Sequence, residues 1–207
     1  MTLKTGLIGV ILLIAVHFKA QQEFTVESID FWKPVADTFS YFNHQDSLRA
    51  SYSLPPSFKK PTAWIEEQHE YRFYSSNDTV GFTLNSVLEI IETEKEFWKV
   101  CAAKTWCFAH PYEVFPYLIC RLSNKTKIGL VNTADLIIWD RIRTGELKFY
   151  GHGGGMQEDI FTIAGRASWI LNWMTGENFA SVGIELTPAL AREYQAAWVQ
   201  YIQTNSK

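Results

Sequence analysis

The chain has 207 residues, of which 47% are hydrophobic and 20% are charged, and its formal net charge is −3. That length suits one domain of ordinary size, and that composition excludes a disordered chain. The mildly acidic balance, without any basic run, argues against nucleic acid or an anionic membrane as the partner.

Residues 1–20 have the pattern of an export signal. Lys4 supplies a positive charge ahead of the apolar run at residues 6–16, and cleavage after Ala20 would leave Gln21 as the first residue. An apolar run of that length is too short to cross a bilayer, so we expect no integral membrane segment once the signal is removed. The mature chain is therefore predicted to be periplasmic or secreted.

The region that follows the signal is mixed in pattern. Pro34 opens a predicted short helix with Val35, Phe39 and Phe42 on one side. Residues 51–61 are rich in Pro, Ser and Lys, which is typical of a connection over the surface. We therefore predict an N-terminal helical extension and linker at residues 21–62, and a helical domain at residues 63–207.

The sequence predicts two helices in the first half of that domain. Residues 63–74 fit a helix or a strand about equally well. A long helix is expected after a cap at Asn85 or Ser86, and its apolar face is formed by Val87, Leu88, Ile91, Trp98 and Cys101. Residues 112–122 predict a buried helix that either kinks at Pro116 or begins beside it.

Two apolar runs with matching ends come next, at residues 134–143 and 159–174. Each is followed by Thr-Gly-Glu, and Gly145 and Gly176 suit a left-handed helix stop. A repeated helix-and-stop unit is what stacked helical hairpins produce. Two unrelated amphipathic helices with glycine caps would look the same, so both interpretations stay open.

A terminal helix closes the chain. Thr187 is a predicted N-cap, Pro188 takes the first helical position, and the apolar stripe is Leu190, Tyr194, Ala197, Trp198, Tyr201 and Ile202. With one or two short strands at most, we expect a mainly α fold of stacked antiparallel helix pairs, either HEAT-like or irregular.

The stop at Thr175 and Gly176 is followed by Phe179 and then by a helix that carries Trp198 and Tyr201. Over residues 111–202 this arrangement loosely resembles helical-repeat proteins of the HEAT-like kind. Members of such families mostly act as scaffolds or binding surfaces. The resemblance therefore implies interaction with a partner, and it carries no catalytic residues.

Residues 151–155 read Gly-His-Gly-Gly-Gly, the most unusual stretch of the chain. A His-Gly-Gly-Gly sequence builds the oxyanion hole of some lipases, but that chemistry needs a later histidine and none follows His152. Gly153, Gly154 and Gly155 would present backbone donors to an anion at a helix start. The acids that follow would repel a phosphate there, and they suit helix capping better.

A metal or acid–base site is the remaining catalytic hypothesis. In it, His152 is the base or ligand, Asp159 the carboxylate, and Arg166 the group that holds an anionic substrate. His110 and Glu158 are further candidates for a metal. Neither a Cys-x-x-Cys nor a His-Glu-x-x-His pattern is present, so no metal and no cofactor are expected.

Two further patterns depend on the compartment. Cys101 and Cys107 would form a disulfide under oxidising conditions, or all three cysteines, Cys120 included, are buried thiols. Asn77 and Asn124 each begin an N-glycosylation acceptor pattern.

Together these patterns favour an exported, non-catalytic binding or structural module with a protein or glycan partner. The alternative is a small hydrolase or metal-dependent enzyme with its site around His152 and Asp159.

Overall fold

The computed structural model describes residues 52–60, 79–133, 136–149, 155–178 and 180–206, all of which belong to the compact unit Phe31–Lys207. Its helices are α5 (Leu84–Thr93), α6 (Phe97–Ala109), α7 (Pro111–Arg121), α8 (Trp139–Arg143), α9 (Ile163–Thr175) and α10 (Pro188–Thr204). Extended pairing in the described part amounts to isolated bridges between single residues. The predicted mainly α fold with few strands is confirmed.

Some expectations fall outside these residues. The export signal at 1–20, the helix after Pro34 and the ambiguous segment 63–74 are among them. Within the described part, none of the helices combines the length and the apolar character needed to cross a membrane.

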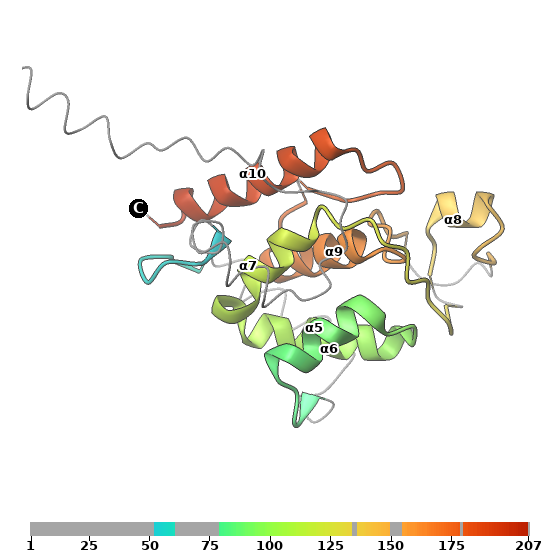
Figure 1. Cartoon of the computed structure of the whole chain (residues 1–207), viewed down its shortest axis with the longest axis horizontal. Coiled ribbons are helices and arrows are strands. Elements are labelled where there is room, and N and C mark those ends of the chain that lie inside the picture. The colour runs from blue at the N-terminus through green and yellow to red at the C-terminus, as the bar shows by residue number, and fades with distance from the viewer. Residues whose placement is uncertain (1–51, 61–78, 134–135, 150–154, 179, 207) are drawn as a thin grey trace, which may run out of the picture. The chain divides into compact units, whose positions relative to one another are not determined.

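Helix α9 is the central element of the described helices (Figure 1). It packs against α5, α6 and α7, and α7 also contacts α6 and α10. A helix with neighbours on several sides needs apolar or small side chains around most of its circumference. The apolar spacing predicted for this run supplies them, and the residues buried are Ile163, Ala164, Ala167, Ile170, Leu171 and Met174.

Helix α9 begins at Ile163, later than the start predicted at Asp159. Thr162 is its N-cap, because its hydroxyl accepts a hydrogen bond from Gly165 N at 3.1 Å and donates one to the Asp159 carbonyl at 2.9 Å. Residues 159–162 therefore form a tight turn against the first turn of the helix. A Cβ atom at Gly165 would lie 1.9 Å from the Asp159 oxygen, so the turn requires glycine there.

The long helix predicted to run through Cys101 is wrong, because residues 94–96 separate α5 from α6. The Glu94 carboxylate accepts hydrogen bonds from the backbone N–H of Lys95 at 2.8 Å and of Glu96 at 3.0 Å. The Lys95 carbonyl accepts a further one from Val131 N at 2.8 Å. Side-chain capping and a long-range backbone contact thus replace the helical hydrogen bonds at the break.

The break changes which side chains are buried. Thr83, and not Asn85 or Ser86, caps α5, and it shares a reciprocal capping box with Ser86. Trp98 follows the break and is 49% exposed, so its predicted place on the apolar face is wrong. The rest of that face is buried as predicted, namely Val87, Leu88, Ile91 and Cys101.

Helix α7 continues through Pro116. It begins at Pro111, so Pro116 lies inside the helix and does not start it. The side chains from Val114 to Arg121 are all buried, which confirms the predicted buried helix.

The helix predicted over residues 134–143 is much shorter in the structure. Residues 136–138 are not helical, and the Ile137 carbonyl accepts a hydrogen bond from Met156 N at 2.9 Å before α8 begins. Gly145 (φ 76°) and Gly176 (φ 71°) are both left-handed, so both predicted stops are confirmed. The helices before them have 5 and 13 residues, so the two runs share a stop and not a repeated helix.

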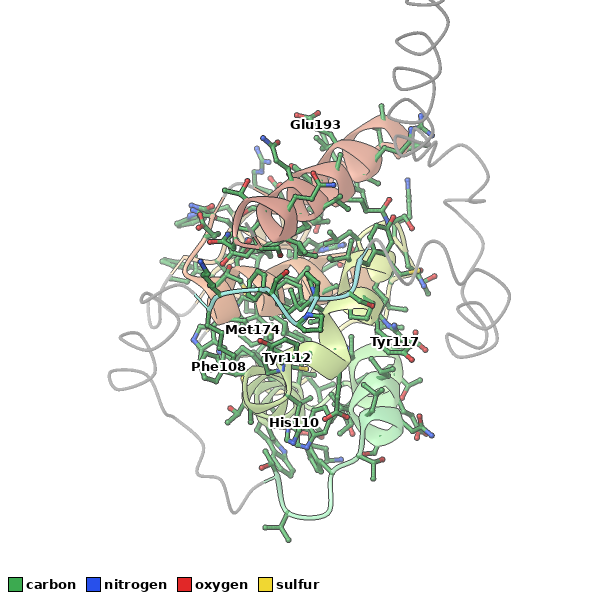
Figure 2. All side chains as sticks on the ribbon, turned by 90° about the vertical axis from the view of Figure 1, so that its left-hand side faces the viewer. Phe108, His110, Tyr112, Tyr117, Met174 and Glu193 are labelled. Atoms are coloured by element: carbon green, nitrogen blue, oxygen red, sulfur yellow. The ribbon has the colours of Figure 1, made fainter. Side chains whose placement is uncertain are left out.

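The C-terminal helix and residues 52–60 pack together. Thr187 caps α10 by accepting a hydrogen bond from Leu190 N at 3.2 Å, as predicted, and Glu193 points away from the helices beneath (Figure 2). The Phe58 ring lies 6.1 Å from the Tyr201 ring. The side chains of Tyr52, Leu54 and Phe58 are buried, so this part of the predicted surface connection belongs to the core. The domain boundary near residue 62 stays a prediction.

The predicted disulfide between Cys101 and Cys107 is wrong. Both residues lie in α6, where six residues advance about 9 Å along the axis. A disulfide needs Cα atoms within about 7 Å. All three cysteines are buried thiols, as the alternative interpretation predicted, and burial raises the pKa of Cys107.

Replacing Gly165 tests the turn before α9. We expect Gly165→Ala to lower the free energy of unfolding by about 3 kcal/mol, because the new methyl group would overlap the Asp159 backbone. Gly183→Ala is the matched control, since a Cβ there meets no atom within 4 Å, and its effect should stay within about 1 kcal/mol. Equal denaturant midpoints for the two variants would contradict the tight turn.

Candidate functional site

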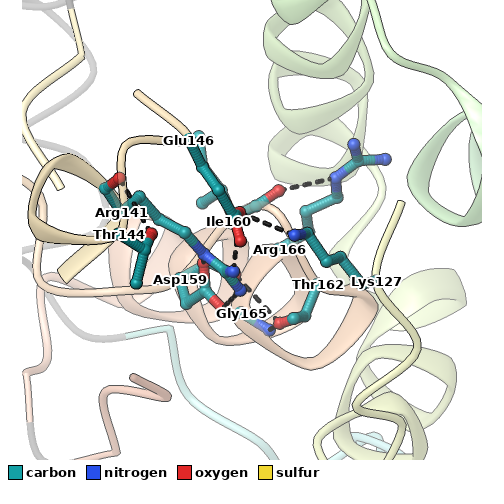
Figure 3. Close-up of polar contacts among 9 residues, drawn as sticks. All are labelled: Lys127, Arg141, Thr144, Glu146, Asp159, Ile160, Thr162, Gly165 and Arg166. Carbon is teal, nitrogen blue, oxygen red and sulfur yellow. Dashed lines mark hydrogen bonds and ion pairs between the residues drawn. The ribbon is translucent and has the colours of Figure 1, made fainter. Parts of the chain in front are cut away.

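Asp159 forms a buried ion pair with Arg141. Arg141 Nε donates to Asp159 Oδ1 at 2.9 Å and Nη2 donates to Oδ2 at 2.6 Å, a two-point contact (Figure 3). Asp159 is 1% exposed and Arg141 is 7% exposed. A buried carboxylate needs a partner of this kind to offset its lost hydration. The structure thus gives the predicted catalytic carboxylate a partner inside the fold.

The ion pair continues toward the surface. Arg141 Nη1 donates to Glu146 Oε2 at 2.8 Å, and Lys127 Nζ lies 2.6 Å from the same oxygen. The hydrogen bond that Arg141 donates to Asp159 is the main cause that raises the pKa of Arg141. The hydrogen bond that Glu146 accepts from Lys127 is the main cause that lowers the pKa of Glu146. The four groups alternate in charge, so each guanidinium or carboxylate has a partner of opposite sign.

Arg166 is fully buried and contacts backbone carbonyl groups. Its Nε donates to Ile160 O at 2.9 Å, Nη1 to Ile91 O at 2.9 Å, and Nη2 to Gly129 O at 2.9 Å. Ile91 lies in the last turn of α5, where carbonyls lack helical partners and carry the negative end of the dipole. Burial lowers the pKa of Arg166 to about 10, so it keeps its charge at neutral pH.

These contacts bear on the predicted role of Arg166 as the holder of an anionic substrate. Each nitrogen of its guanidinium already donates to a carbonyl, and the side chain has no exposed surface. In the structure Arg166 joins the end of α5 to the segment before α9.

Glu158 and Asp159 are adjacent but have different partners. Glu158 Oε1 accepts hydrogen bonds from Asn172 Nδ2 at 2.7 Å and from Ser181 Oγ at 3.2 Å. Asn172 belongs to the last turn of α9, so Glu158 connects that end of the helix to the segment that leads to α10. The two acids therefore do not face one common centre.

His110 lies where α6 meets α7 (Figure 2). Its ring stacks on Trp106 with centroids 3.9 Å apart, and its Nδ1 lies 2.9 Å from the Trp106 carbonyl. Within the part of the chain that the structure describes, no three His, Cys, Asp or Glu side chains are grouped to hold a metal ion. His152, Gly153 and Gly154 lie outside the described residues, and Gly155 is exposed and forms a bridge with Ile137.

The structure reveals an exposed aromatic pair that the sequence did not. Trp139 and Phe149 are 58% and 53% exposed, and their ring centroids lie 5.4 Å apart. In the structure Trp139 is on the outer side of α8, and Arg141 is the residue of that helix that is buried. No local signal distinguishes this arginine from an exposed one, because its partner is Asp159, far along the chain.

One glycosylation pattern can be assessed. Asn124 is buried, its Oδ1 accepts a hydrogen bond from Thr126 N at 3.1 Å, and its carbonyl accepts one from Ala164 N at 2.8 Å. The folded chain therefore does not offer this amide to a glycosylating enzyme. Asn77 lies outside the described residues.

Comparison with known proteins finds no family model, no curated protein and no solved structure that matches the chain.

The ion pair between Arg141 and Asp159 is open to a double-variant test. Asp159→Asn leaves the buried Arg141 charge with only the more exposed Glu146 as its ion-pair partner, and we expect the free energy of unfolding to fall by about 3 kcal/mol or more. Replacing both residues, as Arg141→Met with Asp159→Leu, should cost less than the single changes Arg141→Met and Asp159→Leu added together. Denaturant unfolding of these four variants measures the effects.

The exposed pair between Arg143 and Asp140 provides the control for that series. Arg143→Met should change the unfolding free energy by no more than about 0.5 kcal/mol, because exposed ion pairs contribute little. An Asp159→Asn variant as stable as the parent chain would rule out a structural role for the carboxylate.

Arg166 is tested by a change that keeps its charge. We expect Arg166→Lys to destabilise the fold by about 3 kcal/mol or more, since one ammonium group cannot reach carbonyls on three separate segments. Arg143→Lys, on the exposed face of α8, should be neutral. If Arg166→Lys unfolds at the denaturant concentration of the parent chain, the carbonyl contacts do not stabilise the fold.

Proposed function

We propose that the mature chain is an exported, non-catalytic binding module, and that it recognises a saccharide through Trp139 and Phe149. The observation that carries the proposal is the pair itself: two aromatic side chains that contact each other and are both more than half exposed. Large apolar side chains left in water as a group are typical of binding surfaces.

The segment that carries the aromatic pair is fixed by contacts with the interior of the fold. Helix α8 has only 5 residues, too few to be stable by itself. The ion pair of Arg141 with Asp159 fixes its inner side, and the flanking residues Ile138 and Leu147 belong to a buried apolar cluster. A rigid scaffold that presents exposed rings reduces the entropy lost on binding.

A saccharide fits this surface better than a protein does. A pyranose ring has an apolar C–H face, which an aromatic ring can cover, and a rim of hydroxyl groups that need polar partners. Around the pair, Arg143 and Lys148 are exposed and can supply them. A stable protein partner needs about 800 Å² on each side. The other exposed large apolar side chains of the described part belong to other segments, namely Val80, Trp98, Tyr112 and Val131.

The alternative enzyme around His152 and Asp159 has less support. Asp159 and Arg166 are buried and already hydrogen-bonded within the fold, which favours structural roles for both. His152 lies outside the described residues, so its role stays a prediction.

Binding to a panel of neutral and acidic oligosaccharides tests the proposal. We expect at least one to bind the parent chain in calorimetric titration, and Trp139→Ala with Phe149→Ala to weaken binding at least about tenfold, because both contacts are lost. The melting temperature should hardly change, since both side chains are exposed.

Tyr112→Ala is the matched control, because Tyr112 is a similarly exposed aromatic residue on α7. It should leave saccharide affinity unchanged. Binding that survives loss of the aromatic pair, or a panel with no binder beside a purified protein ligand that the pair does bind, would refute the saccharide assignment.

A further inference from the structure

Lys104 reaches from α6 to an aromatic face of α9. Its Nζ lies 4.3 Å from the ring centroid of Trp169 and 4.1 Å from that of Trp173. The two tryptophans are four residues apart on α9, so they lie on one side of that helix. Two further rings border the site, since Phe97 lies 6.1 Å from Trp169 and Phe108 lies 5.4 Å from Trp173.

The amine is accessible, and within the described part of the chain it has no ion-pair partner. Lys104 and the four rings are all partly exposed. Among the described residues, no carboxylate lies within ion-pair distance of Lys104. Lys99 of the same helix provides the contrast, because its Nζ lies 2.9 Å from Glu94 Oε2. The environment of Lys104 is therefore apolar, with the indole faces as its nearest partners.

That environment changes the protonation of the amine. Burial lowers the pKa of Lys104 from 10.5 to about 8, and the electrostatic interaction with Cys101, three residues earlier on α6, opposes this shift. Helix α9 contributes Trp169 and Trp173 to the surroundings of Lys104. The charged residue Arg166 of the same helix donates its hydrogen bonds to backbone carbonyls. At pH 7.5 a pKa of about 8 leaves about a quarter of the amine unprotonated, against roughly 0.1% for an ordinary lysine.

We propose that Lys104 Nζ is a nucleophilic amine that captures small aldehydes by forming an imine between the aromatic rings. The nitrogen lone pair attacks the carbonyl carbon and forms the C–N bond, and the carbonyl oxygen takes up the proton that nitrogen releases. The resulting carbinolamine loses water to give the imine. The flanking rings exclude part of the solvent, which raises the fraction of the amine that is in its reactive neutral form. This site is separate from the proposed saccharide surface.

The test uses the full chain with acetaldehyde and sodium cyanoborohydride. The aldehyde forms the imine, and the cyanoborohydride supplies hydride to its carbon, giving an ethylated secondary amine that peptide mass spectrometry locates. We expect Lys104 to react at least about tenfold faster than Lys99 at pH 7.5, with a half-maximal rate near pH 8. A rate no higher than that of Lys99, or a half-maximal rate above pH 10, would overturn the proposal.

A control in urea distinguishes reactivity that depends on the folded chain from the intrinsic reactivity of a lysine with the aldehyde. In concentrated urea the two lysines should react at equal rates, because the aromatic surroundings are lost.

The Lys104→Met variant gives an independent measurement, the dependence of stability on pH. Because the pKa is lower in the folded chain than in the unfolded one, the parent chain should gain stability as pH rises from about 8 to 10.5. Relative to the parent chain, the variant should lack that gain, and parallel pH profiles would contradict the altered protonation.

Discussion

The guanidinium of Arg166 joins parts of the chain that are far apart in sequence. It donates to Ile91 at the end of α5, to Gly129 after α7 and to Ile160 before α9. Carbonyls at the end of a helix and in a loop need donors when they are buried. One arginine supplies all three, so α5 can stop inside the core and α9 can occupy its centre.

The ion pair of Arg141 and Asp159 has a related role at the start of the turn 159–162, which precedes α9. It fixes α8 to the start of α9, although α8 is too short to persist alone. Asp159 and Arg166, which residue type alone marks as catalytic candidates, thus form contacts that connect the helices. This favours a function at the surface, where Trp139 and Phe149 are presented, over chemistry in the interior.

Local patterns predicted much of the helical structure. The capping pair Thr187 and Pro188 marked the start of α10, and left-handed glycines ended α8 and α9, because these features depend on neighbours in sequence. The break at Glu94 could not be predicted, since it depends on Val131 and contains neither Gly nor Pro. The site was harder for the same reason: residue type marked Asp159 and Arg166, but their distant partners decide what they do.

The exchange of arginine side-chain protons tests the central claim most directly. In NMR spectra at neutral pH, the Nε protons of Arg166 and Arg141 should exchange with water at least about a hundredfold more slowly than that of exposed Arg143, because both are buried and hydrogen-bonded. Exchange of the Arg166 proton as fast as that of Arg143 would show that its carbonyl contacts do not form in solution.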